Sequence, residues 1–189
     1  QETLQKDERK YFELDKNGNI KINYWTLQGG KYEFGTGTKF KKSFFRLRFA
    51  PGQEMIIPKR DPNGCIVYDA WKRPLAQKVR YISPKGSGMN PFFTSNVRTQ
   101  WSQKKQIETL FFTEGEFKAF TMDSLGLFCV GLPSIHGFYD ENSKLQPGEK
   151  RLHQDILELI KTCRVKSKLI CFFPFCRRKP NKTKATNKL

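Results

Sequence analysis

Glu114, Gly115 and Glu116 are the residues whose types and order best suit chemistry on phosphates. The apolar residues 107–113 before them predict a buried strand, and the apolar spacing of residues 116–124 predicts a helix. Glu114 then falls at the carboxyl end of a strand, where open α/β sheets bind ligands. Glu114 can hold Mg²⁺ or transfer a proton, and Gly115 lets a phosphate approach the backbone. A purely structural interpretation is also open, in which Glu116 stabilises the positive end of the helix dipole.

The elements that would position this junction follow in the second half of the chain. Residues 127–130 predict a second buried strand, and two strands joined by a helix form a βαβ unit with parallel strands. Residues 151–163 place their apolar side chains on one helical face, and residues 168–173 predict a third strand. Residues 101–173 are therefore predicted to form an α/β domain.

Two stretches in this region, residues 113–119 and 130–137, resemble the first half of a Toprim domain. The resemblance is to the Toprim-like domains in primase-related proteins of phages and plasmids. It implies a compact α/β fold with a parallel sheet, and phosphodiester chemistry or nucleotidyl transfer with Mg²⁺. It also implies that Glu114 is the catalytic and metal-binding residue and that Gly115 is the glycine that follows it.

The resemblance ends at the third strand. Toprim domains hold metal with an Asp-x-Asp pair at the end of that strand, whereas no Asp or Glu follows Glu158 here. A single carboxylate binds Mg²⁺ poorly, so we expect the chain as given to be inactive or nearly so. Either the chain is truncated or frame-shifted before the pair, which we favour, or Asp140 or Glu141 replaces it. Residues 174–189 are expected to be a disordered basic tail.

Residues 1–100 predict a basic, β-rich module of short strands separated by turns. Asn17-Gly18 between two β-like runs predicts a hairpin, and residues 61–64 predict another turn. Residues 45–49 alternate, with apolar side chains on one face and arginines on the other.

The basic residues around this alternating strand are candidates for contacting a nucleic-acid backbone. The predicted set is Lys39, Lys41, Lys42, Arg46 and Arg48. Three neighbouring aromatic residues, Tyr24, Trp25 and Phe45, either stack on bases or pack in the core of the module.

Residues 80–93 resemble the segment that precedes the Toprim domain in the same proteins. In this segment Lys85, Gly86 and Gly88 can offer a cation and backbone N–H groups to a phosphate. A solvated loop is the alternative. The spacing G-x-x-x-x-G-K-[ST] is absent, so the segment is not a P-loop.

The composition points to a polyanionic partner. The chain has 35 Lys and Arg against 18 Asp and Glu, a net charge of +17, which makes nucleic acid the expected partner. The resemblance to primase-related proteins implies DNA in particular. No apolar run reaches the ~18 residues of a membrane span, and no membrane partner is expected. Cys65, Cys129 and Cys163 lie among apolar neighbours, which suits buried, reduced thiols in a cytoplasmic protein. The scattered Cys and His residues argue against a zinc site.

We therefore expect an α+β or α/β protein in which a basic β-rich module (1–100) precedes an incomplete Toprim-like parallel βαβ domain (101–173). The leading hypothesis is a DNA-replication protein of mobile-element type that resembles primases and once used Mg²⁺ at Glu114. The alternatives are a non-catalytic nucleic-acid-binding module and an interaction domain whose basic face meets an acidic protein.

Overall fold

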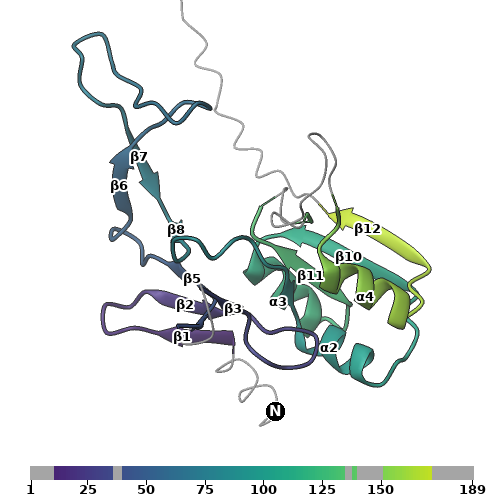
Figure 1. Cartoon of the computed structure of the whole chain (residues 1–189). Helices are drawn as coiled ribbons and strands as arrows, with labels where there is room; N and C mark the ends of the chain where they lie inside the picture. Colours follow the sequence, from purple (N-terminus) through teal and green to yellow (C-terminus); the bar gives the residue numbers. More distant parts are fainter. Residues whose placement is uncertain (1–10, 36–39, 135–137, 140–150, 172–189) are drawn as a thin grey trace, which may run out of the picture.

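The computed structural model describes residues 11–35, 40–134, 138–139 and 151–171 of the chain shown in Figure 1. These residues form two four-stranded sheets, two two-stranded ribbons and three helices. Several sequence-based predictions fall outside the described residues, namely those for Lys39, Asp140, Glu141 and the tail at 174–189.

The C-terminal sheet has the strand order β12-β10-β11-β9. Its central strand β10 (Thr109–Glu114) is parallel to both β11 (Cys129–Leu132) and β12 (Ser167–Cys171). The short strand β9 (Phe92–Phe93) pairs with the other side of β11 in the antiparallel direction. Helix α3 (Glu116–Ser124) connects β10 to β11, so the predicted βαβ unit is confirmed.

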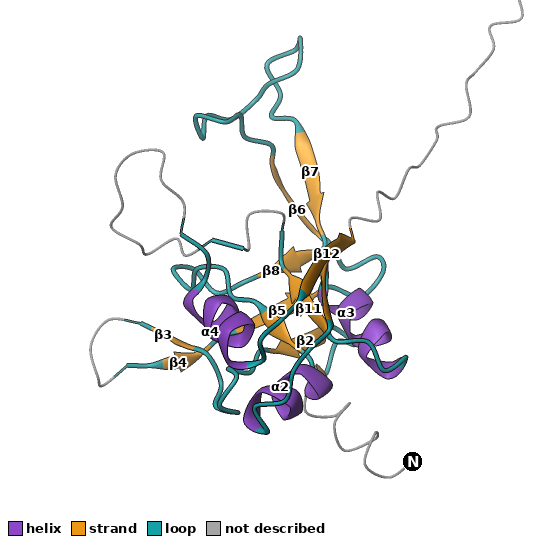
Figure 2. Ribbon diagram, turned by 90° about the vertical axis from the view of Figure 1, so that its right-hand side faces the viewer, coloured by secondary structure: helices purple, strands orange, loops and turns teal. Residues whose placement is uncertain are grey.

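Helices cover both faces of this sheet, and Figure 2 shows α3 on one side of the strands and α4 on the other. On the first face, Ala119 of α3 packs with Phe92 and Cys129. On the second face lie α2 (Ser95–Ser102) and α4 (Gln154–Thr162). The second face is held by a cluster that includes Val97, Leu110, Phe112, Ile156 and Leu159. The apolar helix face predicted within residues 151–163 is thereby confirmed.

The N-terminal sheet is antiparallel throughout and has the order β1-β2-β5-β8. Its strands are β1 (Phe12–Leu14), β2 (Ile20–Asn23), β5 (Phe45–Arg48) and β8 (Tyr81–Ile82). The hairpin predicted at Asn17-Gly18 joins β1 to β2. Gly18 has a φ of 76°, which glycine tolerates best, and the Asp15 carboxylate accepts bonds from the N–H groups of Asn17 and Asn19 at 2.8 Å each.

Two antiparallel ribbons extend from this sheet. In one, β3 (Glu33–Phe34) pairs with β4 (Lys42–Ser43). In the other, β6 (Met55–Pro58) pairs with β7 (Ala76–Val79). The second ribbon and its turns, residues 54–79, project away from the body in Figure 1 and are termed the arm. The arm contains the turn predicted at residues 61–64, where the Gly64 N–H donates to the Asp61 carbonyl.

The two sheets share their hydrophobic core. One buried cluster combines Tyr11, Ile22, Tyr24 and Phe44 from the N-terminal half with Phe92, Ala119 and Cys129 from the C-terminal half. Leu27 is buried in the other cluster, among side chains of α2, α4 and the C-terminal sheet.

Three tyrosines of the N-terminal half each bond to one of the three described helices. The Tyr11 hydroxyl accepts from Arg98 of α2, at 2.7 Å from Nη2, while Tyr24 donates to Glu116 at the start of α3. Tyr32 donates to Asp155 in the first turn of α4. The boundary expected near residue 100 falls inside α2, which packs in the core of the C-terminal sheet together with Leu27.

The described chain is thus a mixed α/β fold, rich in strands, with a parallel sheet. Among the described residues, no helix has the length and apolar character needed to cross a bilayer. Cys129 and Cys163 are buried as predicted, and burial raises the pKa of the Cys163 thiol. The expectation of a buried thiol is wrong for Cys65, which is exposed in a turn of the arm.

Candidate functional site

The junction between β10 and α3 consists of Glu114, Gly115 and Glu116, and these three residues are placed very differently. Glu114 ends β10 with its side chain exposed. Gly115 caps α3 with a φ of 97°, a conformation that L side chains rarely adopt, and its N–H donates to the Leu132 carbonyl at 2.8 Å. A Cβ on Gly115 would meet no atom within 4 Å. The backbone conformation therefore explains the glycine, and open space lies beside it.

Glu116 turns into the protein and is 1% exposed. Its Oε1 accepts a bond from Arg46 Nη1 at 2.6 Å and another from the Tyr24 hydroxyl. Burial, together with the Glu116 charge, holds the pKa of Tyr24 well above its usual value. Burial disfavours the charge on Arg46, but the interactions with Glu116 and Tyr24 together outweigh burial and raise the pKa of Arg46. Glu116 is therefore the anion of a buried network that links β5 and Tyr24 to the start of α3.

Gly131 fixes the distance between α3 and β11. A Cβ there would lie 3.0 Å from the Ala119 Cβ and 3.3 Å from the Gly115 carbonyl oxygen and from the Phe92 Cβ. The helix therefore approaches the strand more closely than a side chain would permit. This packing holds the N-terminus of α3, and with it the junction, against the end of β11.

The two arginines of β5 lie against the start of α3. Arg46 also donates to the Pro133 carbonyl at 3.3 Å, just after β11, and its guanidinium lies 4.8 Å from the Tyr81 ring centroid. The Arg48 guanidinium lies 4.8 Å from the Phe117 ring centroid. The predicted alternation of β5 is therefore present, and its basic face meets the junction. Arg46 is mostly buried, with a side chain 15% exposed, whereas no acidic side chain pairs with Arg48 among the described residues.

The loop at 83–91 reaches the same end of the parallel sheet. Its Met89 sulfur lies 3.2 Å from the Ser134 hydroxyl, two residues beyond β11. Lys85 and Gly86 are exposed in a turn closed by a bond from the Ser87 N–H to the Pro84 carbonyl, and Gly86 takes a φ of 76°. Gly88 is also exposed, with a φ of 66°. This loop and the two arginines of β5 thus lie near the carboxyl end of β11.

The other residues that were predicted to contact nucleic acid form no bond to the junction in the described part of the chain. Lys41 pairs with Glu33 across the β3–β4 ribbon at 3.4 Å, and Lys42 is exposed on β4. The suggestion that Tyr24 stacks on bases is wrong, because its ring is fully buried. Trp25 is half-buried, with Lys31 5.3 Å and Arg98 6.0 Å from its ring centroid.

The carboxylates at the strand ends are not gathered into a cluster in the described part of the chain. Within the described residues, no group of three or more His, Cys, Asp or Glu side chains could hold a metal ion. Glu116 is already neutralised by Arg46, and β12 contains no acidic residue. Glu114 is therefore a single exposed carboxylate, and hard dications normally need further oxygen ligands.

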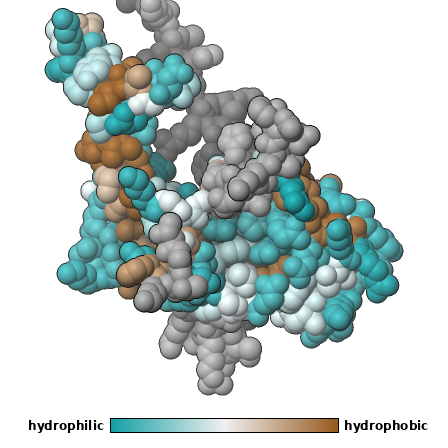
Figure 3. Space-filling view, in the orientation of Figure 1, coloured by the Kyte–Doolittle hydropathy of each residue, from teal (hydrophilic) through white to brown (hydrophobic). Residues whose placement is uncertain are grey.

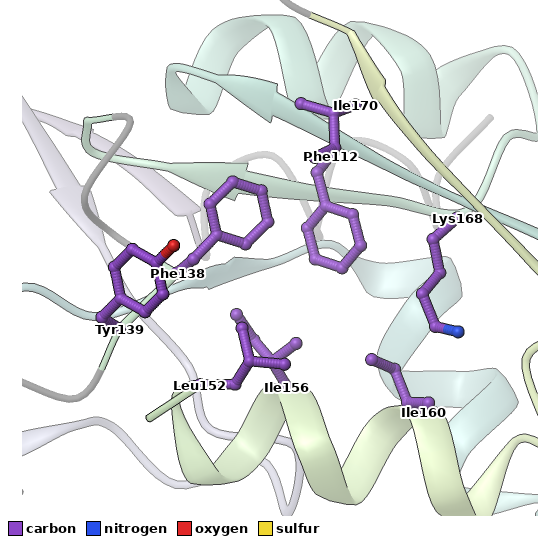
Figure 4. A pocket seen from close by; sticks show the side chains of 8 residues that line it. All are labelled: Phe112, Phe138, Tyr139, Leu152, Ile156, Ile160, Lys168 and Ile170. Atoms are coloured by element: carbon purple, nitrogen blue, oxygen red, sulfur yellow. The ribbon is translucent and has the colours of Figure 1, made fainter. Parts of the chain in front are cut away.

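A pocket of about 420 Å³ lies on the opposite face of the sheet, between α4 and strands β10 and β12 (Figure 4). Apart from the Lys168 ammonium and the Tyr139 hydroxyl, its lining side chains are apolar. They are Phe112, Phe138, Leu152, Ile156, Ile160 and Ile170. Glu114 does not line it, so the pocket is separate from the junction.

Comparison of the chain with protein-family models, with curated protein sequences and with solved structures found no match. The class that the fold defines is a mixed α/β protein whose central parallel strand ends in a Glu-Gly-Glu junction. The Toprim resemblance remains a prediction that rests on the motif residues.

Two features of the structure were not anticipated from the sequence. Arg46 and Glu116 are 70 positions apart in the sequence, and no local pattern in either segment predicts that they pair. The exposed Trp71 in the arm was also missed, although a signal was present. Residues 68–73 place two aromatic side chains beside two cations within a turn, a composition typical of a binding loop rather than of a core strand.

Proposed function

We propose that this protein binds nucleic acid through the phosphate backbone, along the surface between the β10–α3 junction and the loop at 83–91. The observation that carries the proposal is the use of Glu116 as the buried partner of Arg46. Glu114 is exposed at the end of β10, Lys85 is exposed in the loop at 83–91, and Arg48 is half-buried. Such a surface suits a polyanion better than a metal-dependent reaction.

The physical basis is charge and geometry. A net charge of +17 attracts polyanions from a distance and releases their counterions on binding. At the surface, Arg48 and Lys85 supply cations, and the exposed Gly86 and Gly88 leave backbone accessible to a phosphate. Arg46 contributes less, because its charge is balanced within the protein.

The test is a salt series of fluorescence-anisotropy titrations with a labelled single strand and a duplex, each of about 20 nucleotides. Affinity for either form is expected to fall steeply between about 50 and about 200 mM salt. Lys85→Gln should weaken binding and reduce the salt slope for a single strand by about 0.7. Lys105→Gln, which removes an exposed cation from the loop after α2, is the matched control and should change neither the affinity nor the salt slope. Absence of binding at low salt, or an equal effect of the two substitutions, contradicts the proposal.

Glu114→Gln separates binding from catalysis. If binding is the function, the substitution removes a negative charge near the phosphate path, so affinity is unchanged or rises slightly, with or without Mg²⁺. The second candidate is the Mg²⁺-dependent phosphoryl or nucleotidyl transfer that the Toprim resemblance implies. It is favoured by the placement of Glu114 at the carboxyl end of the first strand of a βαβ unit. Mg²⁺-dependent primer synthesis or DNA cleavage by the wild type, lost in Glu114→Gln, would establish it in place of binding alone.

A further inference from the structure

The arm is a forked ribbon held together by backbone bonds. Beyond the paired strands β6 and β7, three residues form a ring of hydrogen bonds. The Lys59 N–H donates to the Leu75 carbonyl at 2.7 Å, and the Leu75 N–H donates to the Val67 carbonyl at 2.8 Å. The Val67 N–H donates in turn to the Lys59 carbonyl at 2.9 Å, which closes the ring. From this ring the chain makes two short hairpins, with bridges Arg60–Ile66 and Tyr68–Pro74.

Both hairpins close with the same turn. In each, an aspartate carboxylate accepts bonds from the N–H groups two and four residues later, at 2.9 Å, and the residue three positions on has a positive φ. The aspartates are Asp61 and Asp69, and the positive-φ residues are Gly64 (82°) and Lys72 (58°). These turns fix the conformation of the tips without any contribution from a core.

No residue between positions 51 and 80 is buried. Nevertheless, the arm carries large apolar side chains in the open, with Ile56 66%, Tyr68 53% and Trp71 76% exposed. Figure 3 shows brown, hydrophobic patches along the projecting part of the molecule. An exposed apolar surface of this kind on a ribbon that has no core marks an interaction site.

The charge of the arm indicates the chemistry of its partner. Residues 54–79 contain five Lys or Arg and three acids. Asp61 and Asp69 are engaged in the turns, and Asp69 Oδ2 also accepts from Arg73 Nε at 2.9 Å. Held in this way, the Arg73 guanidinium lies 5.1 Å from the Trp71 ring centroid and stiffens an indole that is otherwise exposed. Aromatic faces between cations match single-stranded nucleic acid, which offers unpaired bases that can stack on them along an anionic backbone.

We propose that the arm is a stacking surface for the unpaired bases of single-stranded nucleic acid, with Trp71 as its main contact and Tyr68 as a second. This inference rests on the proposed function and adds to it a preference for single strands. The phosphates next to the stacked bases are bound by Arg60, Lys72 and Arg73. In a duplex the bases are already stacked on one another, so Trp71 has no base to receive and adds little.

The test compares affinity for a labelled oligothymidine of about 20 nucleotides with affinity for a duplex of the same length. Trp71→Ala should weaken single-strand binding about ten-fold and leave duplex binding unchanged. Trp71→Phe, which keeps an aromatic face, should restore most of the affinity. Leu125→Ala, which truncates a residue that is 72% exposed after α3, is the matched control and should have no effect.

The outcomes separate the arm from the proposed function. If the wild type binds and Lys85→Gln weakens binding while Trp71→Ala does not, the inference about the arm is overturned and the proposed function stands. Equal losses for single strand and duplex also overturn it, because base stacking is then not involved. A change in oligomeric state with unchanged DNA affinity would assign the arm to a protein interface instead. If the wild type binds no nucleic acid at low salt, both ideas fail.

Discussion

The buried pair of Arg46 and Glu116 is the feature whose removal should have the largest effect on stability. Glu116→Gln preserves the shape of the side chain and an acceptor for the Tyr24 hydroxyl, but it removes the negative charge. Arg46 is then left as a cation with 15% of its side chain exposed and no acidic partner. Breaking one side of a buried pair is costly because the remaining charge has lost its hydration without compensation.

The expected magnitude follows from the geometry. Removing one member of a buried pair typically costs about 3–5 kcal/mol. The low end applies here, because Arg46 keeps its bond to the Pro133 carbonyl and its contact with the Tyr81 ring. We therefore expect Glu116→Gln to lower the free energy of unfolding by about 3 kcal/mol, a large part of the typical total of about 5–15 kcal/mol.

The assay is urea unfolding followed by circular dichroism. Glu108→Gln is the matched control, because Glu108 pairs with Lys166 at 3.0 Å, yet both side chains are more than half exposed, and such pairs contribute at most about 1 kcal/mol. A double-mutant cycle with Arg46→Met isolates the coupling, and replacing both partners by apolar residues should recover part of the loss. The reasoning is refuted if Glu116→Gln costs no more than Glu108→Gln.

Two further predictions concern the same packing. The unfolded chain loses tyrosine protons near the usual pKa of 10.0, whereas Tyr24 and Tyr32 keep theirs in the folded state, since burial and the charges of their acidic partners raise both pKa values. The unfolding free energy should therefore fall as pH rises above 10, and Tyr24→Phe should reduce that slope by about 1.4 kcal/mol per pH unit in urea titrations at several pH values. Gly131→Ala should cost about 1–3 kcal/mol, because its Cβ would crowd Ala119. The control Gly30→Ala, whose Cβ would have its closest contact at 3.7 Å, should cost less, and an equal loss would contradict this account.

The parts of the fold that follow from local patterns could be predicted from the sequence. The apolar run before Glu114 and the helical spacing after Glu116 specify a strand and a helix, and a helical crossover makes β10 and β11 parallel. The hairpin at Asn17-Gly18 was predictable for the same reason, since the turn residues themselves require the conformation. Such signals are carried by a few neighbouring residues.

What the sequence could not show depends on contacts between distant segments. The charge of Glu116 next to a helix N-terminus suggested a favourable dipole interaction, which is local, whereas its actual partners are Arg46 on β5 and Tyr24, which follows β2. The arginine pattern of β5 likewise indicated a polar face but not what that face meets. Tyr24 was predicted either to stack on bases or to pack in a core, and only tertiary packing decides between the two.

The arm and the junction differ in what stabilises them, and the difference bears on function. Three features stabilise the conformation of the junction, namely a buried ion pair, a glycine at positive φ and the close packing at Gly131. The arm has no buried residue, and ordering a chain costs roughly 1–2 kcal/mol per residue in backbone entropy. Its aspartate turns and ring of backbone bonds offset part of that cost, but a two-stranded ribbon alone is only marginally stable in water. Burial of Trp71 and Tyr68 against a partner would supply the missing apolar contact, so a bound single strand should slow amide exchange at Val67 and Leu75 more than at the junction.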